Sequence, residues 1–365
     1  MSRQSIFIFE WFCCQPQPVE AVNGTNRPTD KEARKALAKE GAEMLLAILQ
    51  GINSNRNFEL HTLGDEELAA RLPKGVRVHP LSPGTPTTKN VRAVAELCDF
   101  SIIIAPELDG NLWNLANEVA ETNCQLLSPD PRFIGLTADK LALARHLKET
   151  HVGTPATFLL RDFNSRCREL DDSVIVKPRH GAGSQSTFVF PDAKNGRPLI
   201  DRLKDPDQYI VQSFLEGISI SVSVLCGGNE VAPIFLPPTQ QIFHAHLPSF
   251  DGNSFQHGSF SHANPLPQKE LADRALQLAN EAIHALPPTR GIVGIDMILS
   301  PDSMPAEETA NRLHDCVIEV NPRMTSSVPF VAKYLRPNLF ADMIEQALPS
   351  QKSCRPTKSD SGSSG

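Results

Sequence analysis

The sequence predicts a protein with both α/β and α+β parts. A doubly wound, Rossmann-like α/β domain at the N-terminus precedes two antiparallel sheets. Over residues 1–135, short apolar runs alternate with segments of helical periodicity, as in a parallel sheet covered by helices. Residues 173–190 form an apolar strand, a glycine-containing loop and a second apolar strand. Residues 291–299 and 317–323 are two further apolar strands, each with one carboxylate inside it. Together these observations indicate domains at 1–135, 136–215 and 216–350.

Composition excludes several classes of protein. The chain has 365 residues, a hydrophobic content of 40% and a net charge of −7, so we expect a water-soluble protein that binds neither nucleic acid nor anionic membranes. No apolar run is long enough to span a bilayer. The eight cysteines show no zinc-site spacing, and we expect a reducing, cytoplasmic location. Residues 351–365 are polar and are predicted to be a disordered tail, either native or appended.

The N-terminal segment carries acidic residues where its strands are expected to end. Residues 6–9 and 100–104 are the clearest strands, and ligands of doubly wound sheets gather at the carboxyl ends of such strands. Three acidic residues follow them: Glu10, Glu107 and Asp109. They are candidates for a substrate site. The alternative is that Asp109 is a helix N-cap and that both glutamates are solvated.

The second segment begins near residue 136 with a helix that either Thr137 or Asp139 could cap. Four short apolar runs follow and are expected to form an antiparallel sheet: residues 156–160, 174–177, 187–190 and 209–212.

The loop between the second and third of these runs is a candidate phosphate site. Lys177 ends the run 174–177, and the small-residue loop 180–184 follows it. Glycines let backbone N–H groups approach an anion, and the lysine adds a positive charge. The Walker A pattern is absent. The alternative is an ordinary glycine-rich turn beside a surface lysine.

The third segment carries acidic groups typical of a metal site. Asp296 lies inside one apolar strand and Glu319 inside the next, with Asn321 two residues further on the same face. An isolated charge in such a strand is costly unless it is paired or binds a metal, and oxygen ligands suit Mg²⁺. Arg323 follows and could stabilise developing negative charge. The alternative is a buried Asp or Glu that is hydrogen-bonded inside the core.

These motifs, taken in order, resemble those of the ATP-grasp enzymes. The matching residues are Asp139-Lys140, Val176-Lys177-Pro178, Gln212-x-Phe214-x-x-Gly217, Gly294-x-Asp296 and Glu319-x-Asn321-Pro322-Arg323. The resemblance implies an ATP-grasp fold with an N-terminal Rossmann-like pre-ATP-grasp domain, a small subdomain at 136–215 and a metal-binding subdomain at 216–350. It also implies ATP and Mg²⁺ (or Mn²⁺) as cofactors.

The same resemblance implies roles for individual residues. Lys140 and Lys177 would contact the nucleotide phosphates, and Asp296, Glu319 and Asn321 would hold the metal. The loop over the β- and γ-phosphates would be Gly181, Ala182, Gly183 and Ser184. The turn along the adenine would be Gln212, Ser213, Phe214 and Leu215. Where many members have a glutamate for the ribose, this chain has Ser219. With Lys177, Arg323 would be catalytic.

Further residues are similar to those of the tyramine–glutamate ligases within this family. They are Phe9-Glu10-Trp11, residues 105–110, residues 219–223 and residues 318–323. This similarity implies an enzyme that joins a small carboxylic acid to an amine through an acyl phosphate, in a pathway of the methanofuran type. Glu10, Glu107 and Asp109 would receive the amine, with Gln241 near the acceptor. Another acyl-phosphate enzyme on the same core and a non-catalytic ATP-binding module are the alternatives.

Overall fold

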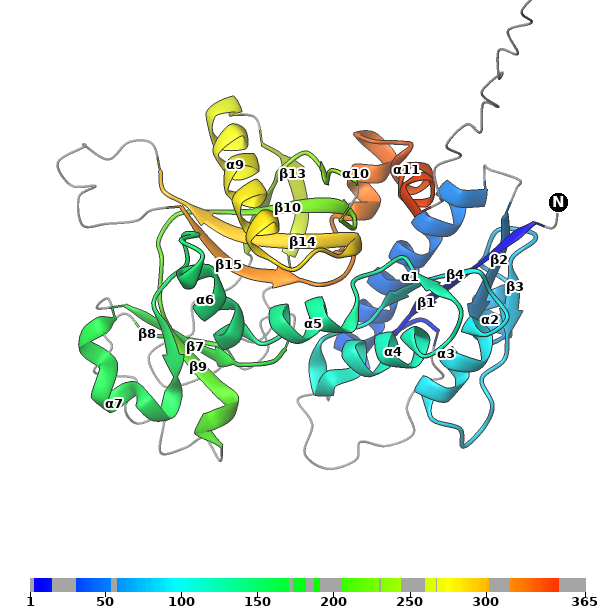
Figure 1. Ribbon diagram of the computed structural model, residues 1–365, viewed down its shortest axis with the longest axis horizontal. Helices are drawn as coiled ribbons and strands as arrows, with labels where there is room; N and C mark the ends of the chain where they lie inside the picture. The colour runs from blue at the N-terminus through cyan, green and yellow to red at the C-terminus, as the bar shows by residue number, and fades with distance from the viewer. Residues whose placement is uncertain are drawn as a thin grey trace, which may run out of the picture.

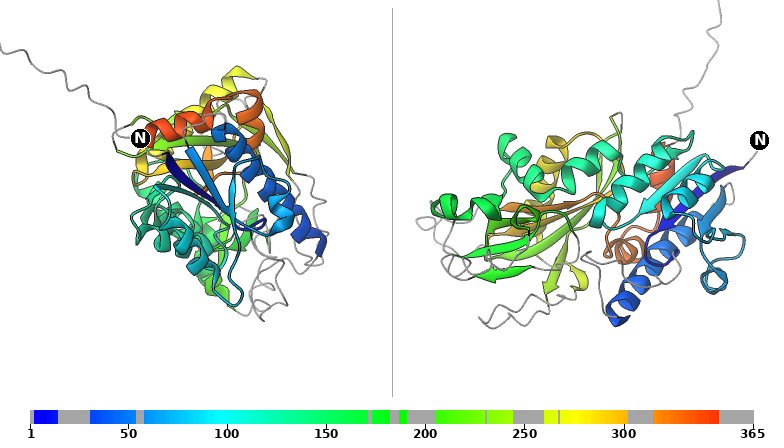
Figure 2. Two further views of the ribbon diagram at one scale, coloured as in Figure 1. Left: turned by 90° about the vertical axis from the view of Figure 1, so that its right-hand side faces the viewer. Right: turned by 90° about the horizontal axis from the view of Figure 1, so that it is seen from below.

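Three sheets make up the protein, and they follow one another along the chain (Figure 1). The computed structural model describes residues 3–14, 31–53, 58–170, 173–181, 187–190, 205–229, 231–243, 260–266, 268–301 and 315–347. The N-terminal sheet lies at one end of the long axis and the smallest sheet at the other, as the view from below also shows (Figure 2). None of the helices in these ranges combines the length and apolar character that crossing a membrane requires.

The N-terminal sheet is parallel, with strand order β3-β2-β1-β4-β5. Its strands are β1 (Gln4–Glu10), β2 (Phe58–Leu63), β3 (Arg77–His79), β4 (Phe100–Ile104) and β5 (Gln125–Leu126). Its helices are α1 (Lys31–Asn53), α2 (Glu66–Ala69), α3 (Thr87–Ala95) and α4 (Asn111–Ala120), with the short turn η1 (Leu108–Gly110) before α4. The central strands are buried on both faces, which explains their continuous apolar runs.

Two short helices lead out of this domain. Helix α5 (Pro131–Thr137) was not predicted, although Asp130 caps it and Pro131 occupies its first turn. Helix α6 (Lys140–Glu149) begins after Asp139, whose carboxylate accepts two backbone N–H bonds. Thr137 lies inside α5 and donates to a carbonyl there, so the alternative that it caps α6 was wrong.

The predicted second sheet is present and antiparallel, with order β6-β9-β7-β8. Its strands are β6 (Thr157–Leu159), β7 (Val174–Pro178), β8 (Phe188–Phe190) and β9 (Tyr209–Ser213). Between them lie η2 (Leu160–Asp162), α7 (Phe163–Arg166), η3 (Cys167–Glu169) and η5 (Pro206–Gln208). We call this the small sheet.

The largest sheet has the order β13-β12-β10-β14-β15, and β11 pairs with β10. Its strands are β10 (Ile218–Gly227), β11 (Ile234–Phe235), β12 (Thr239–Phe243), β13 (Phe260–Pro265), β14 (Arg290–Leu299) and β15 (Cys316–Asn321). Helix α9 (Lys269–Ala285) covers its apolar face, where buried residues of β10 and β14 form one core with the helix. The opposite face therefore remains for polar side chains.

The last two helices return to the first domain. Helices α10 (Val328–Tyr334) and α11 (Leu339–Ala347) pack against α1 and share its apolar core (Figure 1). Gly51 of α1 lies so close to Phe340 that an added Cβ would be 2.5 Å from that ring. The N-terminal domain is thus built from both ends of the described chain.

Candidate active site

A row of polar residues crosses the large sheet on the face opposite α9. Thr239, Ser221, Asp296 and Glu319 are direct partners on neighbouring strands β12, β10, β14 and β15. Direct partners in antiparallel strands place their side chains on the same face. The pairing of Asp296 with Glu319 confirms the prediction that two neighbouring strands each present one carboxylate. The serines at alternate positions of β10 were the signal that could have identified the rest of the row.

Hydrogen bonds within the sheet orient the carboxylate of Asp296. Gln241 donates through Nε2 to Oδ1 at 2.9 Å, and Asn321 donates through Nδ2 to Oδ2 at 2.9 Å. Ser219 in turn donates to Oε1 of Gln241 at 2.8 Å. Gln241 and Ser219, predicted for different substrates, thus belong to one network with the metal-type residues. Because Asn321 donates through its amide nitrogen, its amide oxygen stays available as a ligand.

The two carboxylates are close enough to influence each other's protonation. Burial raises the pKa of Asp296 to about 6, and the nearby charge of Glu319 adds to the rise. Burial also acts to raise the pKa of Glu319, but Lys140 and Lys177 outweigh it and hold that pKa below its usual value. Two carboxylates and an amide group on neighbouring strands are a donor set that fits Mg²⁺ or Mn²⁺, whose charge would relieve the repulsion between the carboxylates.

Two lysines from different elements act electrostatically on the carboxylate of Glu319. Lys140, at the start of α6, forms an ion pair with Glu319 at 2.8 Å and donates to the carbonyl of Gly181 at 2.7 Å. Lys177, at the end of β7, is only 6% exposed. Burial lowers its pKa to about 8, against the attraction of Glu319. An anion bound here would stabilise the charged form of Lys177.

A clamp that the sequence did not reveal joins α6 to the small sheet. Arg179 donates from Nε and Nη2 to the two carboxylate oxygens of Asp139, at 2.8 and 2.5 Å. The backbone N–H of Lys140 also donates to the carbonyl of Arg179. Asp139 thus caps α6 and forms a bidentate ion pair, so it fixes Lys140 relative to β7.

Arg323 connects the large sheet to the N-terminal domain. Its Nε donates to Oε1 of Glu107 at 3.0 Å, and both side chains are largely buried, with exposed fractions of 16% and 3%. The other carboxylate oxygen of Glu107, Oε2, is buried and has no hydrogen-bond partner among the described residues. A buried carboxylate oxygen without a donor is costly, so this atom is a candidate acceptor for a substrate N–H.

The other two acidic candidates of the N-terminal domain are placed differently. Glu10 is buried, and its Oε2 accepts the backbone N–H groups of Phe12 and Cys13 in the turn after β1. Helix α1 passes so near that a Cβ at Gly41 would lie 2.1 Å from that oxygen. Asp109 is exposed in a left-handed turn with φ of 53°, and Gly110 is the N-cap of α4. The alternatives of an N-cap for Asp109 and of two solvated glutamates were wrong, because Gly110 is the N-cap and both Glu10 and Glu107 are buried.

The predicted nucleotide turn follows β9. Gln212 is buried and donates through Nε2 to the hydroxyl of Thr157 on β6 at 2.9 Å. Ser213 is also buried, whereas Phe214 and Leu215 are partly exposed at the junction of the small and large sheets. Ala182, Gly183 and Ser184 lie outside the described residues, as does the predicted tail at 351–365.

The comparison with known families agrees with this arrangement. The sequence pattern of the ATP-grasp domain matches residues 137–327, slightly more than half of the chain, and that of the pre ATP-grasp 3 domain matches residues 58–134. The chain belongs to the ATP-grasp family. The prediction of an ATP-grasp fold with an N-terminal pre-ATP-grasp domain is confirmed.

Relatives of this ATP-grasp protein include several ligases. It is 23% identical over 233 residues to the tyramine–L-glutamate ligase of Methanocaldococcus fervens, which covers 64% of the chain and 61% of that ligase. It is 24% identical to the D-alanine–D-alanine ligase of Carboxydothermus hydrogenoformans, over 82% of the chain and 96% of that enzyme. Among solved structures, an ATP-grasp superfamily protein of Archaeoglobus fulgidus has a TM-score of 0.65 at 22% identity, covering 93% of this chain and 88% of the other.

Proposed function

We propose that the protein is an ATP-dependent carboxylate–amine ligase. The observation that carries this proposal is the convergence of three cations, Lys140, Lys177 and Arg323, from three parts of the chain on the carboxylate pair of the large sheet. Such a site neutralises the charge of a triphosphate and of a phosphoryl group in transfer. The names of the relatives, ligases for tyramine and glutamate or for D-alanine, agree with amide formation.

The nucleotide lies between the small and large sheets in this proposal. Lys140 and Lys177 bind its phosphates, with the loop from Gly181 to Ser184 above them. The turn from Gln212 to Leu215 lines the adenine, and Ser219 faces the ribose. Asp296, Glu319 and Asn321 hold Mg²⁺ or Mn²⁺, which supplies charge neutralisation at the phosphates.

The reaction has two steps. A carboxylate oxygen of the acid attacks the γ-phosphorus and ADP leaves, so that a poor leaving oxygen becomes a good one. The amine nitrogen then attacks the acyl carbon, the C–N bond forms and phosphate leaves. Arg323 stabilises the charge of the acyl phosphate and its tetrahedral adduct. Burial of the site slows hydrolysis of the acyl phosphate by water.

Glu107 is the residue that we assign to the amine. Its Oε1 holds Arg323 and its Oε2 has an unfilled acceptor position, so it lies between the acid and the N-terminal domain. The turn hydrogen bonds of Glu10 and the exposure of Asp109 make these two residues weaker candidates. We propose glutamate as the acid and tyramine or a similar arylalkyl amine as acceptor, in cofactor biosynthesis of the methanofuran type.

An amino-acid ligase is the second candidate, because the similarity to D-alanine–D-alanine ligase covers most of both chains. Purified protein would be incubated with ATP, Mg²⁺ and a matrix of acids and amines, with ADP release and product mass as readouts. Glutamate with tyramine should stimulate ADP release and give the amide. Stimulation by amino-acid pairs alone would favour the second candidate. Stimulation by bicarbonate alone, or by no acceptor, would refute the ligase proposal.

A further inference from the structure

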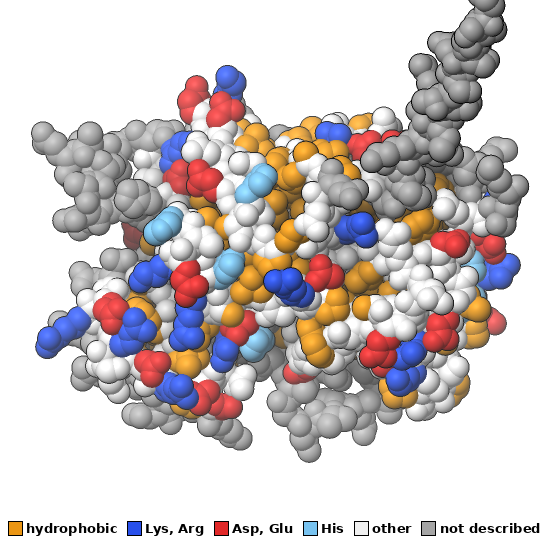
Figure 3. Space-filling model, in the orientation of Figure 1, with side chains coloured by type: hydrophobic (Ala, Val, Ile, Leu, Met, Phe, Trp, Pro, Cys, Tyr) orange, Lys and Arg blue, Asp and Glu red, His pale blue; other side chains and the backbone are white. Residues whose placement is uncertain are grey.

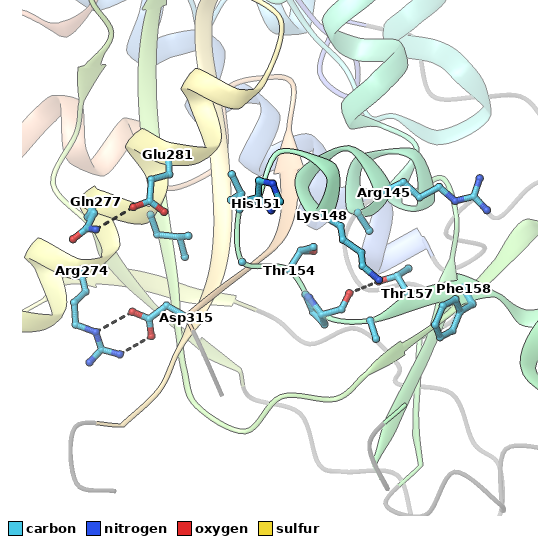
Figure 4. Close-up of a pocket in the computed structure, with 16 residues that line it drawn as sticks. Arg145, Lys148, His151, Thr154, Thr157, Phe158, Arg274, Gln277, Glu281 and Asp315 are labelled. Atoms are coloured by element: carbon cyan, nitrogen blue, oxygen red, sulfur yellow. Dashed lines mark hydrogen bonds and ion pairs between the residues drawn. The ribbon is translucent and has the colours of Figure 1, made fainter. Parts of the chain in front are cut away.

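A pocket at the C-terminal end of α6, away from Lys140 at the start of that helix, has no part in the proposed reaction. It has a volume of about 690 Å³, within the usual range for small-molecule sites. It lies between the last turns of α6, the segment 151–158 that enters the small sheet, and α9 (Figure 4). Asp315, the residue before β15, closes one end.

The two helices give this pocket walls of opposite charge. The α6 side carries Arg145, Lys148 and His151, and no ion pair joins Lys148 to any residue in the described part of the chain. The α9 side carries Glu281, which accepts a hydrogen bond from Gln277 at 3.0 Å (Figure 4). In the space-filling view, side chains of both signs lie close together over the α6 and α9 region (Figure 3). Such a pair of walls matches a ligand that carries both charges.

The floor of the pocket is apolar. Val152, Leu278 and Phe158 are buried there, with exposed fractions of 6% each. Arg274, near one end, is already held by a bidentate ion pair with Asp315 and is not available as a ligand group. The cationic wall, the acidic wall and the apolar floor therefore define three separate contacts.

We propose that this pocket binds a free amino acid with an apolar or aromatic side chain. Its carboxylate lies toward Lys148 and His151, its ammonium group toward Glu281, and its side chain on Val152 and Leu278. His151 adds a second observation: its φ is 61°, at a helix end where glycine is the usual residue. A non-glycine side chain held in this conformation is typical of functional positions.

A ligand there would also influence the nucleotide site. The pocket includes Thr157, whose hydroxyl accepts the hydrogen bond of Gln212 in the proposed adenine turn. It also includes Gly153, whose carbonyl accepts the N–H of Val317 in β15, the strand of Glu319. The ligand would thus bridge α9 to the first strand of the small sheet. Binding of the amino acid and of ATP should change each other's dissociation constants by the same factor, on the order of 5-fold or more.

Calorimetry on the full chain tests the proposal with three probes of matched shape: L-phenylalanine, phenethylamine and 3-phenylpropionate. L-phenylalanine should bind at least 10-fold more tightly than the two probes that lack one charge. Lys148→Ala and Glu281→Gln should each weaken its binding by about 10-fold. Lys333→Ala, which removes an exposed lysine from the corresponding last turn of α10, should leave binding unchanged.

Active-site variants separate this pocket from the substrate site. Lys177→Ala should keep the affinity for L-phenylalanine, because it alters only the proposed phosphate site. A non-hydrolysable ATP analogue should shift the affinity of the wild type, with the reciprocal shift in its own. Absence of binding at 10 mM would overturn the proposal, as would affinity that survives both pocket substitutions. Loss of ligase activity in every acid and amine combination would leave these binding results unaffected.

Discussion

Lys177 provides the sharpest test of the site, because its positive charge should cost stability while it supports catalysis. A pKa of about 8 instead of the ordinary 10.5 means that burial disfavours the charged form. At about 1.4 kcal/mol per pKa unit, the charge costs about 3 kcal/mol at pH 7 in the absence of ligand. This group is almost fully buried, so solvent screening does not reduce the cost appreciably.

The substitution Lys177→Met keeps the length of the side chain and removes the charge. We expect the free energy of unfolding to rise by up to about 3 kcal/mol, a value that already includes the attraction between Lys177 and Glu319. Turnover should fall by roughly 10²–10³-fold, the usual effect of removing one preorganised charge-stabilising group. Urea unfolding monitored by circular dichroism and a coupled assay of ADP release would measure the two effects.

Lys140→Met is the matched control. Lys140 forms the ion pair with Glu319 directly, and its removal leaves a carboxylate that is 24% exposed with a weaker partner. We expect a loss of about 1–3 kcal/mol, smaller than for a fully buried pair because water reaches Glu319. Both variants should lose activity, but their stabilities should change in opposite directions. Equal destabilisation by both, or turnover within a few-fold of wild type for Lys177→Met, would refute the reasoning.

Three further predictions concern the acidic residues and Asn321. Asp296→Asn, Glu319→Gln and Asn321→Ala should each raise the Mg²⁺ concentration needed for half-maximal ATP binding, measured by calorimetry; early melting with unchanged Mg²⁺ dependence would instead favour buried, purely structural carboxylates. Glu107→Gln should raise the amine KM by about 10–150-fold, the effect of losing 1.5–3 kcal/mol in a charged hydrogen bond. The ATP KM should change much less, and the control Asp109→Asn should change neither KM. An equal rise in both KM values for Glu107→Gln would count against the assignment. Burial raises the pKa of Glu10 to about 7, so the stability that its protonated side chain contributes is present at low pH and is lost as pH rises through 7. Relative to Glu10→Gln, the wild type should lose up to about 3 kcal/mol of unfolding free energy between pH 5 and 8. Curves of unfolding free energy against pH that run parallel for the two proteins would contradict this.

Features of the site that depend on one strand could be predicted from the sequence. A lone carboxylate in an apolar strand is costly enough to mark Asp296 and Glu319 without knowledge of the fold. Lys177 was visible as a charge at the end of an apolar run. The hydrogen bond from Gln241 to Asp296 was not, because it requires β12 to lie beside β10 while β14 lies on the other side. Strand order is a property of the whole sheet.

The same limit applied to contacts between subdomains. The Asp139–Arg179 clamp joins residues 40 positions apart, and neither residue is unusual in its local sequence. Helix α5 is short and its apolar residues show little helical periodicity, although Asp130 before Pro131 is a recognisable N-cap in the sequence. Helices α10 and α11 show ordinary amphipathic patterns, which predict a buried face but not that α1 covers it.

The ion pair between Glu107 and Arg323 suggests why the catalytic core and the N-terminal domain are joined so extensively. Removing one partner of a buried pair costs about 3–5 kcal/mol, since the other charge is left without compensation. Arg323 follows the metal-type strand β15. Its side chain is held by Glu107, which follows β4 and lies 216 residues away in the chain. The return of α10 and α11 onto α1 fixes the segment just after Arg323 to the same domain. The positions of the proposed acid and amine therefore depend on one contact between the two domains. Phe340→Ala, which loosens α11 from α1, should lower turnover when both substrates are saturating. This loss should appear under conditions in which the N-terminal sheet and the large sheet are still folded.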